Sequence, residues 1–145
     1  MKLTSLVFTE GGRIPSKYTC EGLNISPDLS IGNLPANTKS LAIIVDDPDA
    51  PGGNWDHWIV WNMAPNTATI AENSVPNGAV EGRNDFRKTE YGGPCPPRGV
   101  HHYQFKLYAL DVTLDLLRAN KNDLEKAMQG HVLDQATLVG LYSRE

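Results

Sequence analysis

Glycine and proline are spread through most of this chain and leave only short apolar runs between them. Thirteen glycines and ten prolines make up about 16% of the 145 residues, against about 12% in an average protein. Neither residue suits the interior of a helix, because glycine costs backbone entropy and proline removes a hydrogen-bond donor. The chain is therefore expected to be a loop-rich, mostly β protein rather than a helical bundle.

Five segments have the pattern of β-strands. Segment 40–45 is almost continuously apolar, which is typical of a fully buried strand. In segment 103–110 apolar residues alternate with more polar ones, which predicts one buried and one partly solvated face. The other expected strands are 3–8, 57–63 and 131–142. Together these segments predict a β-sandwich.

One helix is predicted near residue 122. Asn122 is suited to an N-cap, Glu125 completes a capping box with it, and Gly130 ends the helix. The apolar residues expected to dock on a sheet are Leu124, Ala127 and Met128. A chain of this length buries roughly 70% of its unfolded surface without metal or disulfide. We expect residues 1–145 to form a single domain, a mostly β sandwich with one or two short helices.

Charge and hydropathy exclude several classes of partner. The chain has 17 acidic and 13 basic residues, a net charge of −4, and its longest basic run is Arg87 and Lys88. Nucleic acid is therefore not an expected partner. No apolar stretch approaches the ~20 residues of a membrane span, and residues 1–15 lack the pattern of a signal peptide. These observations predict a soluble, cytoplasmic protein.

The two cysteines, Cys20 and Cys95, lie far apart in the sequence. Their spacing matches neither a CxxC motif nor a zinc-ligand pattern. In a reducing compartment such residues are free thiols. We therefore expect two unpaired thiols, each buried or half-buried.

Four segments between the expected elements are long and rich in turn-forming residues: 11–35, 46–55, 65–77 and 84–100. Most connections in compact domains have 4–6 residues, and longer ones are either functional or disordered. The positions at which these loops enter strands are therefore the candidates for functional residues.

Three histidines stand at such positions. His57 begins a strand directly after one loop, and His101 and His102 begin another directly after a second loop. If these strands are neighbours, Asp47 or Asp49 converges with the imidazoles on one small polar cavity. Imidazoles together with loop N–H groups suit a phosphate or a carboxylate. The alternative for each histidine is a structural hydrogen bond.

The three tryptophans, Trp55, Trp58 and Trp61, are spaced three residues apart. This spacing differs from the period of two that places strand residues on one face. We expect these side chains to pack in the core and at its rim rather than to form an aromatic ligand cage.

Two motifs carry a family resemblance. The first is Asp-Pro-Asp-Ala-Pro at 47–51, followed by Trp55 and His57. The second is Gly-Pro-x-Pro-Pro-x-Gly-x-His-x-Tyr at 93–103. With the closing segment 130–142, they resemble the signatures of the phosphatidylethanolamine-binding protein (PEBP) family, in its prokaryotic Raf kinase inhibitor-like branch. The resemblance extends from residue 8 to residue 142.

The resemblance implies two antiparallel sheets with a small anion-binding cavity at one end. Family members bind phosphate-like and carboxylate groups there, including phospholipid headgroups, and animal members regulate kinases. A kinase or protease partner and a homodimer are therefore expected here. By motif position, the implied ligand-binding residues are Asp47, Trp55 at the rim, His57, Gly93, Pro94, His101 and Tyr103.

The resemblance also implies a cis peptide bond between Ala50 and Pro51, with Asp47 turned to the cavity and Asp49 supporting the loop. Two features depart from the family pattern. His102 stands where the second signature commonly has arginine, and the C-terminal helix that animal members carry is not expected after the last strand.

An enzyme is the alternative to a binding protein. Asp47, His57 and His101 could form an acid–base set for hydrolysis of small phospho- or acyl esters, and Cys95 beside a histidine could supply a nucleophile. The chain has no G-x-S-x-G elbow and no HExxH motif. We therefore predict a binding protein with no catalytic residues, no cofactor and no metal.

Overall fold

The computed structural model describes residues 1–144, which form two antiparallel β-sheets, one α-helix and one short 3₁₀ helix. The three-stranded sheet has the order β1 (Lys2–Thr4), β2 (Leu29–Gly32) and β5 (Thr69–Ile70). The five-stranded sheet has the order β6 (Val80–Glu81), β4 (Trp55–Met63), β3 (Ser40–Asp47), β7 (His101–Leu110) and β8 (Val132–Tyr142). The helices are η1 (Ser16–Tyr18) and α1 (Lys121–Met128). The predicted mostly β, two-sheet fold is confirmed.

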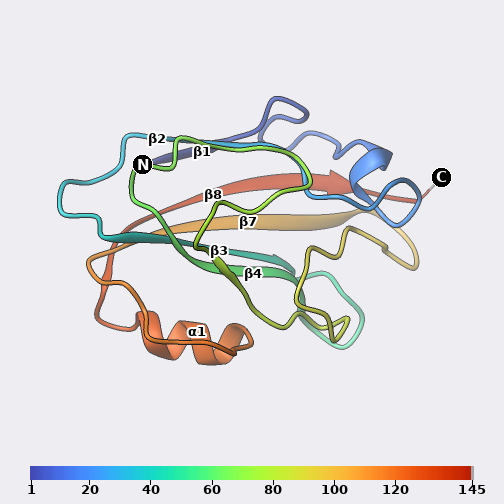
Figure 1. Cartoon of the computed structure of the whole chain (residues 1–145). Helices are drawn as coiled ribbons and strands as arrows, with labels where there is room; N and C mark the ends of the chain where they lie inside the picture. Colours follow the sequence, from blue (N-terminus) through green and yellow to red (C-terminus); the bar gives the residue numbers. More distant parts are fainter. Residues whose placement is uncertain (145) are drawn as a thin grey trace.

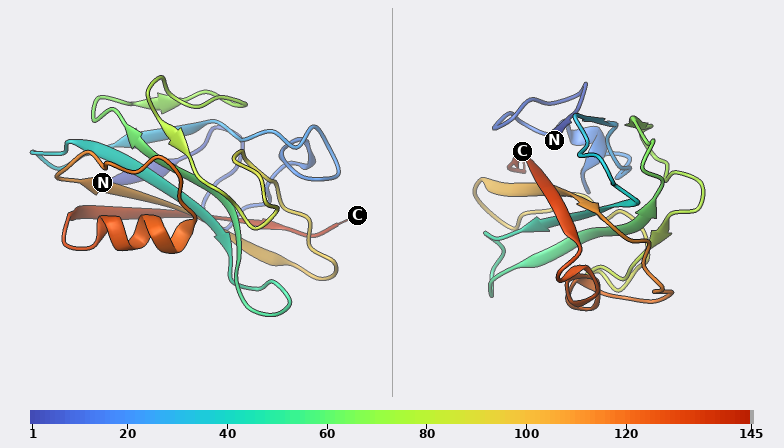
Figure 2. Two further views of the ribbon diagram at one scale, coloured as in Figure 1. Left: turned by 60° about the horizontal axis from the view of Figure 1, so that its bottom comes forward. Right: turned by 90° about the vertical axis from the view of Figure 1, so that its left-hand side faces the viewer.

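The five-stranded sheet lies between the smaller sheet and the helix. Figure 1 shows β1 and β2 on one side of this sheet and α1 on the other, and Figure 2 (right) shows the same layers from the end. Strand β3 therefore alternates between two apolar clusters. Leu41, Ile43 and Val45 belong to the cluster under the small sheet, whereas Ala42 and Ile44 belong to the cluster under α1. Burial on both faces explains why this segment is continuously apolar.

The tryptophans of β4 are distributed by the same geometry. Trp58 and Trp61 are an odd number of residues apart, so they project from opposite faces and each enters a different apolar cluster. The indole N–H of Trp58 donates to the Glu81 carboxylate at 2.8 Å, and that of Trp61 to the Leu116 carbonyl at 2.9 Å. The packing interpretation is confirmed for this pair, and Trp55 lies at the rim with 37% of its surface exposed.

The helix begins two residues earlier than predicted. Its N-cap is Asn120, which forms a reciprocal capping box with Asp123, so the predicted cap at Asn122 with Glu125 is wrong. The sequence contains the same Asn-x-x-acid pattern twice, displaced by two residues. Local pattern cannot choose between them, because each register satisfies two N–H groups of a helix N-terminus in the same way.

Several strands also differ from the prediction. The first expected strand, 3–8, is reduced to three residues in β1, and β2 and β5 lie inside segments expected to be loops. Strands of two to four residues are too short to leave a readable alternation. Within residues 1–144, no helix has the length and apolar character to cross a membrane.

The predicted cis bond at Ala50–Pro51 is wrong, since every peptide bond of residues 1–144 is trans. The chain reverses through the two glycines that follow. Gly52 and Gly53 have φ angles of 83° and 117°, and the Gly53 N–H donates to the Ala50 carbonyl at 3.0 Å. Left-handed backbone at glycine provides the turn without an isomerised proline.

Candidate functional site: a histidine-lined cavity

A cavity of about 370 Å³ lies at one end of the five-stranded sheet. The end of β3, the start of β4 and the start of β7 meet there because the three strands are antiparallel neighbours. Of the seven predicted ligand-binding residues, five line this cavity: Asp47, Trp55, His57, His101 and Tyr103. The other lining residues are Ala50, Pro51, Phe86, Cys95, Pro96 and Pro97.

Asp47 joins β3 to the start of β7. Its Oδ2 accepts a hydrogen bond from Nδ1 of His101 at 2.6 Å, and its Oδ1 accepts from the Asp49 N–H at 2.8 Å. Asp47 and His101 are only 3% and 7% exposed. Because a carboxylate can only accept, Nδ1 of His101 carries the hydrogen. Asp47 thus orients both the ring and the loop that follows it.

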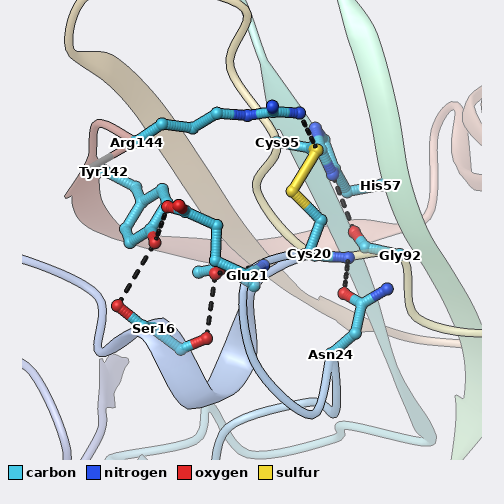
Figure 3. The surroundings of a disulfide bond; sticks show 11 residues. Ser16, Cys20, Glu21, Asn24, His57, Gly92, Cys95, Tyr142 and Arg144 are labelled. Atoms are coloured by element: carbon cyan, nitrogen blue, oxygen red, sulfur yellow. Dashed lines mark hydrogen bonds between the residues drawn. A yellow bond between two sulfur atoms is a disulfide. The ribbon is translucent and has the colours of Figure 1, made fainter.

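His57 is held by Gly92, the residue directly before the second signature. Its Nδ1 lies 2.7 Å from the Gly92 carbonyl oxygen (Figure 3) and must be the donor, because that oxygen can only accept. Burial lowers the pKa of His57 below its usual value, although hydrogen bonding to the backbone opposes this effect. The ring is therefore neutral at neutral pH. Phe86 and Tyr103 meet it edge to face, with centroids at 5.3 and 5.2 Å.

The two rings present the same unsatisfied atom. Within residues 1–144, Nδ1 of each ring is used and Nε2 of each has no hydrogen-bond partner. Among residues 1–144 the Tyr103 hydroxyl has no hydrogen-bond partner either, although only 1% of Tyr103 is exposed. Burial, followed by the charges of Asp47 and Asp49, raises its pKa. A neutral phenol and two free imidazole nitrogens therefore border one cavity.

Gly93 and Pro94 do not line the cavity. The Gly93 N–H donates to Oδ1 of Asn24 at 2.8 Å, and the Pro94 carbonyl accepts from the Cys20 N–H at 3.1 Å. These contacts fasten the second signature loop onto the segment after η1. Both residues thus shape the wall that carries Cys95, Pro96 and Pro97 without facing the cavity themselves.

Asp49 and His102 form a second link between the signature loops, outside the cavity. Oδ2 of Asp49 accepts from the His102 N–H at 2.8 Å and from its Nδ1 at 2.7 Å. These hydrogen bonds lower the pKa of the Asp49 carboxyl. Asp47 lines the cavity, as expected, but the Asp49 carboxylate binds His102 across the two loops rather than N–H groups of its own loop. The exposed His102 ring is hydrogen-bonded to Asp49.

Phe86 is a cavity residue that the sequence did not reveal. Buried Asn84 folds the loop that carries it: Nδ2 donates to the Glu90 carbonyl at 2.7 Å, and Oδ1 accepts from the Phe86 N–H at 2.9 Å. This arrangement brings Phe86 edge to face with both Trp55 and His57. A single phenylalanine in an irregular loop has no periodicity, so no local pattern indicates its place.

The expectation of two free thiols is wrong, because Cys20 and Cys95 form a disulfide across 75 residues of sequence. Their Cα atoms lie 5.4 Å apart, within the range that a disulfide requires. Cys20 is exposed and Cys95 is half-buried in the cavity wall. Only the meeting of the two loops, which the spacing of the cysteines does not encode, makes the pairing available.

Across residues 1–144, no cluster of three or more metal-ligating side chains is present.

Fold and cavity together define a class: a two-sheet antiparallel sandwich with a histidine-lined cavity at one end of its larger sheet. Residues 4–143 match the family model described as phosphatidylethanolamine-binding protein. The chain belongs to the phosphatidylethanolamine-binding protein family, as the two signatures predicted.

Relatives and solved structures agree over nearly the whole chain. A UPF0098 protein of Methanothermobacter thermautotrophicus is 51% identical over 99% of both chains, and one of Pyrococcus horikoshii is 53% identical over 97% of this chain and 76% of its own. The PEBP homolog CT736 of Chlamydia trachomatis superposes with a TM-score of 0.96 at 43% identity, covering 99% of this chain and 97% of its own. Escherichia coli YbcL, described as a member of the mammalian PEBP family, gives 0.93 at 32% identity, with coverages of 99% and 98%.

The lowered pKa of His57 predicts a pH dependence of stability. Since the folded-state pKa lies below the unfolded value of about 6.5, the unfolded chain binds the proton first as the pH falls. The neutral His57 ring therefore stabilises the fold above pH ~6.5. As the pH falls from that value to the folded-state pKa, the free energy of unfolding decreases by up to about 1.4 kcal/mol per pH unit. Urea unfolding of wild type and His57→Asn at pH 7 and pH 5 measures this contribution. The asparagine amide can still donate to the Gly92 carbonyl, so a loss on acidification as large as that of wild type would contradict the assignment.

Proposed function

We propose that this protein is a binding protein whose cavity holds a small anion with a phosphate, phosphomonoester or carboxylate group. The observation that carries the proposal is the pair of imidazoles anchored through Nδ1, with Nε2 free beside the unpartnered Tyr103 hydroxyl. A buried hydroxyl without a partner is costly and rare, and a phosphate-like ligand offers this hydroxyl an oxygen acceptor and the imidazoles an O–H donor.

The hydrogen-bonding state of His57 restricts the ligand further. A neutral ring whose Nδ1 donates to the Gly92 carbonyl presents Nε2 as an acceptor. The matching ligand must therefore donate one hydrogen bond while accepting another from Tyr103. Hydrogen phosphate and a singly protonated phosphomonoester have both capacities. Sulfate has the same shape and no hydrogen to donate at neutral pH, so it should bind less well.

Phosphate is expected to raise the melting temperature more than sulfate at equal ionic strength. A ligand that binds only the folded state adds about 1.4 kcal/mol when its concentration is ten times Kd. Thermal unfolding of wild type, His57→Ala and His101→Ala tests the site, and the phosphate shift should shrink in both variants. The control is His131→Ala, since His131 is exposed and paired with Asp111 far from the cavity. Equal phosphate shifts in all four proteins would place binding elsewhere.

A hydrolase remains the alternative, because the Asp47–His101 pair at 2.6 Å resembles an acid–base arrangement. The nucleophile considered for it, Cys95, is bonded to Cys20. We propose that the cavity binds without turnover. Product release from ester and phosphoester panels should not exceed the level of His101→Ala, and a clear excess would favour the enzyme.

We also propose a regulatory role through a kinase or protease partner, and a homodimer, both on the resemblance to the Raf kinase inhibitor-like branch. The proposed cytoplasmic location rests instead on the hydropathy pattern of the sequence. Native mass spectrometry of protein purified from its own host would report both subunit number and any retained anion. A monomer with no retained anion would contradict the homodimer. Anion binding in the cavity would then be tested by the phosphate titration alone.

A further inference from the structure

We propose that the Cys20–Cys95 bond is a thiol–disulfide exchange site, at which an external thiol attacks Cys20 and releases Cys95 as a thiolate in the cavity wall. The exchange needs no anion in the cavity and does not rest on the proposed function. Two observations support this direction of attack: the unequal exposure of the two cysteines and the position of Arg144.

The two cysteines differ in accessibility. Cys20 is exposed on the turn after η1, whereas Cys95 is half-buried between two prolines and lines the cavity. Figure 3 shows the bond joining these two loops. Exchange requires an incoming thiolate to reach a sulfur atom. Access therefore directs the attack to Cys20.

Arg144 favours the release of Cys95 as a thiolate. Nη2 of Arg144 lies 2.7 Å from the Cys95 sulfur, and Figure 3 shows the guanidinium reaching over the disulfide. A neighbouring guanidinium stabilises a thiolate, and a sulfur whose thiolate is more stable leaves faster. Accessibility and leaving-group stabilisation thus point to the same direction of cleavage.

The exchange balances with a dithiol as the reductant. The incoming thiolate forms a bond to the Cys20 sulfur, the Cys20–Cys95 bond breaks, and its electron pair remains on Cys95. The second thiolate of the dithiol then attacks the mixed disulfide, closes the oxidised reductant and releases Cys20, which takes up a proton. The dithiol is oxidised, and the two cysteines are reduced.

Contacts beside the disulfide hold the loops together after cleavage. The Cys20 N–H still donates to the Pro94 carbonyl, and the Gly93 N–H to Asn24. The Tyr142 hydroxyl donates to Glu21 and lies 3.2 Å from the Ser16 hydroxyl, which can donate to it in turn. The Cys95 thiolate is therefore expected to stay in the wall that it shares with His57 and His101, where its charge would oppose an anion. This last consequence alone rests on the proposed function.

The direction of attack is tested on the folded, oxidised protein. A brief exposure to glutathione, quenched with N-ethylmaleimide and followed by peptide mapping, should place glutathione on Cys20 and maleimide on Cys95. Glutathione mainly on Cys95, or reaction only in denaturant, would overturn the proposal. Near-ultraviolet circular dichroism of the tryptophans confirms that the chain stays folded during the exposure.

The role of Arg144 is tested by the rate of reduction with dithiothreitol, followed by intact mass. Arg144→Gln should reduce roughly three- to tenfold more slowly than wild type, and Arg144→Lys should recover most of the rate. Arg98→Gln removes the same charge from the second signature loop and serves as the control. An unchanged rate in Arg144→Gln would overturn the leaving-group assignment. Failure of phosphate to bind the oxidised protein would remove the proposed function and leave these results intact.

Discussion

Reduction of the Cys20–Cys95 bond is expected to lower the free energy of unfolding by about 4–5 kcal/mol. The bond closes a loop across 75 residues. In the chain-entropy description, such a cross-link lowers the conformational entropy of the unfolded chain, which stabilises the folded state by about 4–5 kcal/mol. The expected fall in melting temperature is about 10–15 °C, given the stability changes typical of chains of this size. This prediction depends on the length of the loop that the bond closes.

Urea unfolding of the oxidised and reduced protein measures the difference. The Cys20→Ser/Cys95→Ser double variant should unfold near the reduced wild type and should not respond to reductant. A difference below about 1 kcal/mol between oxidised and reduced protein would contradict the prediction. It would mean that the reduced unfolded chain keeps residual structure that already restricts it.

Gly93→Ala is expected to cost about 3 kcal/mol, the upper part of the usual range for overpacking. A Cβ at this position would lie 2.4 Å from both the Tyr18 carbonyl oxygen and Oδ1 of Asn24, and 2.9 Å from Cα of Thr19. Two of these three atoms belong to the backbone of the η1 segment, so a side-chain rotation cannot relieve the contact. The second signature loop must shift, and the cavity wall with it.

The matched control is Gly32→Ala, where an added Cβ has no atom within 4 Å. That substitution should change the free energy of unfolding by no more than about 0.5 kcal/mol. Urea unfolding measures both variants, and phosphate titration should show weaker binding in Gly93→Ala alone. Equal stability of the two variants would contradict the close approach of the loops at Gly93.

The pKa of His57 and the position of Phe86 show why part of the site could not be predicted. Both signatures placed Asp47, Trp55, His57, His101 and Tyr103 correctly on one cavity, because loops that end at neighbouring strands of one sheet must converge. The neutral state of His57 depends on its burial and on the Gly92 carbonyl. The sequence contains neither fact, since both arise from loops that meet only in the folded chain.

What the sequence determined by itself is the local pattern: the long strands β3, β4, β7 and β8, the mostly β class and the two signature loops. Their periodicity extends over eight or more residues, enough for burial on one or both faces to appear as a repeat. Only the tertiary structure decided the two- to four-residue strands, the cap at Asn120 and the trans bond before Pro51. It also decided that Gly93 and Pro94 support the wall and that Cys20 joins Cys95. The short strands, the supporting contacts of Gly93 and Pro94 and the disulfide depend on contacts between segments far apart in the chain, and such contacts leave no local repeat.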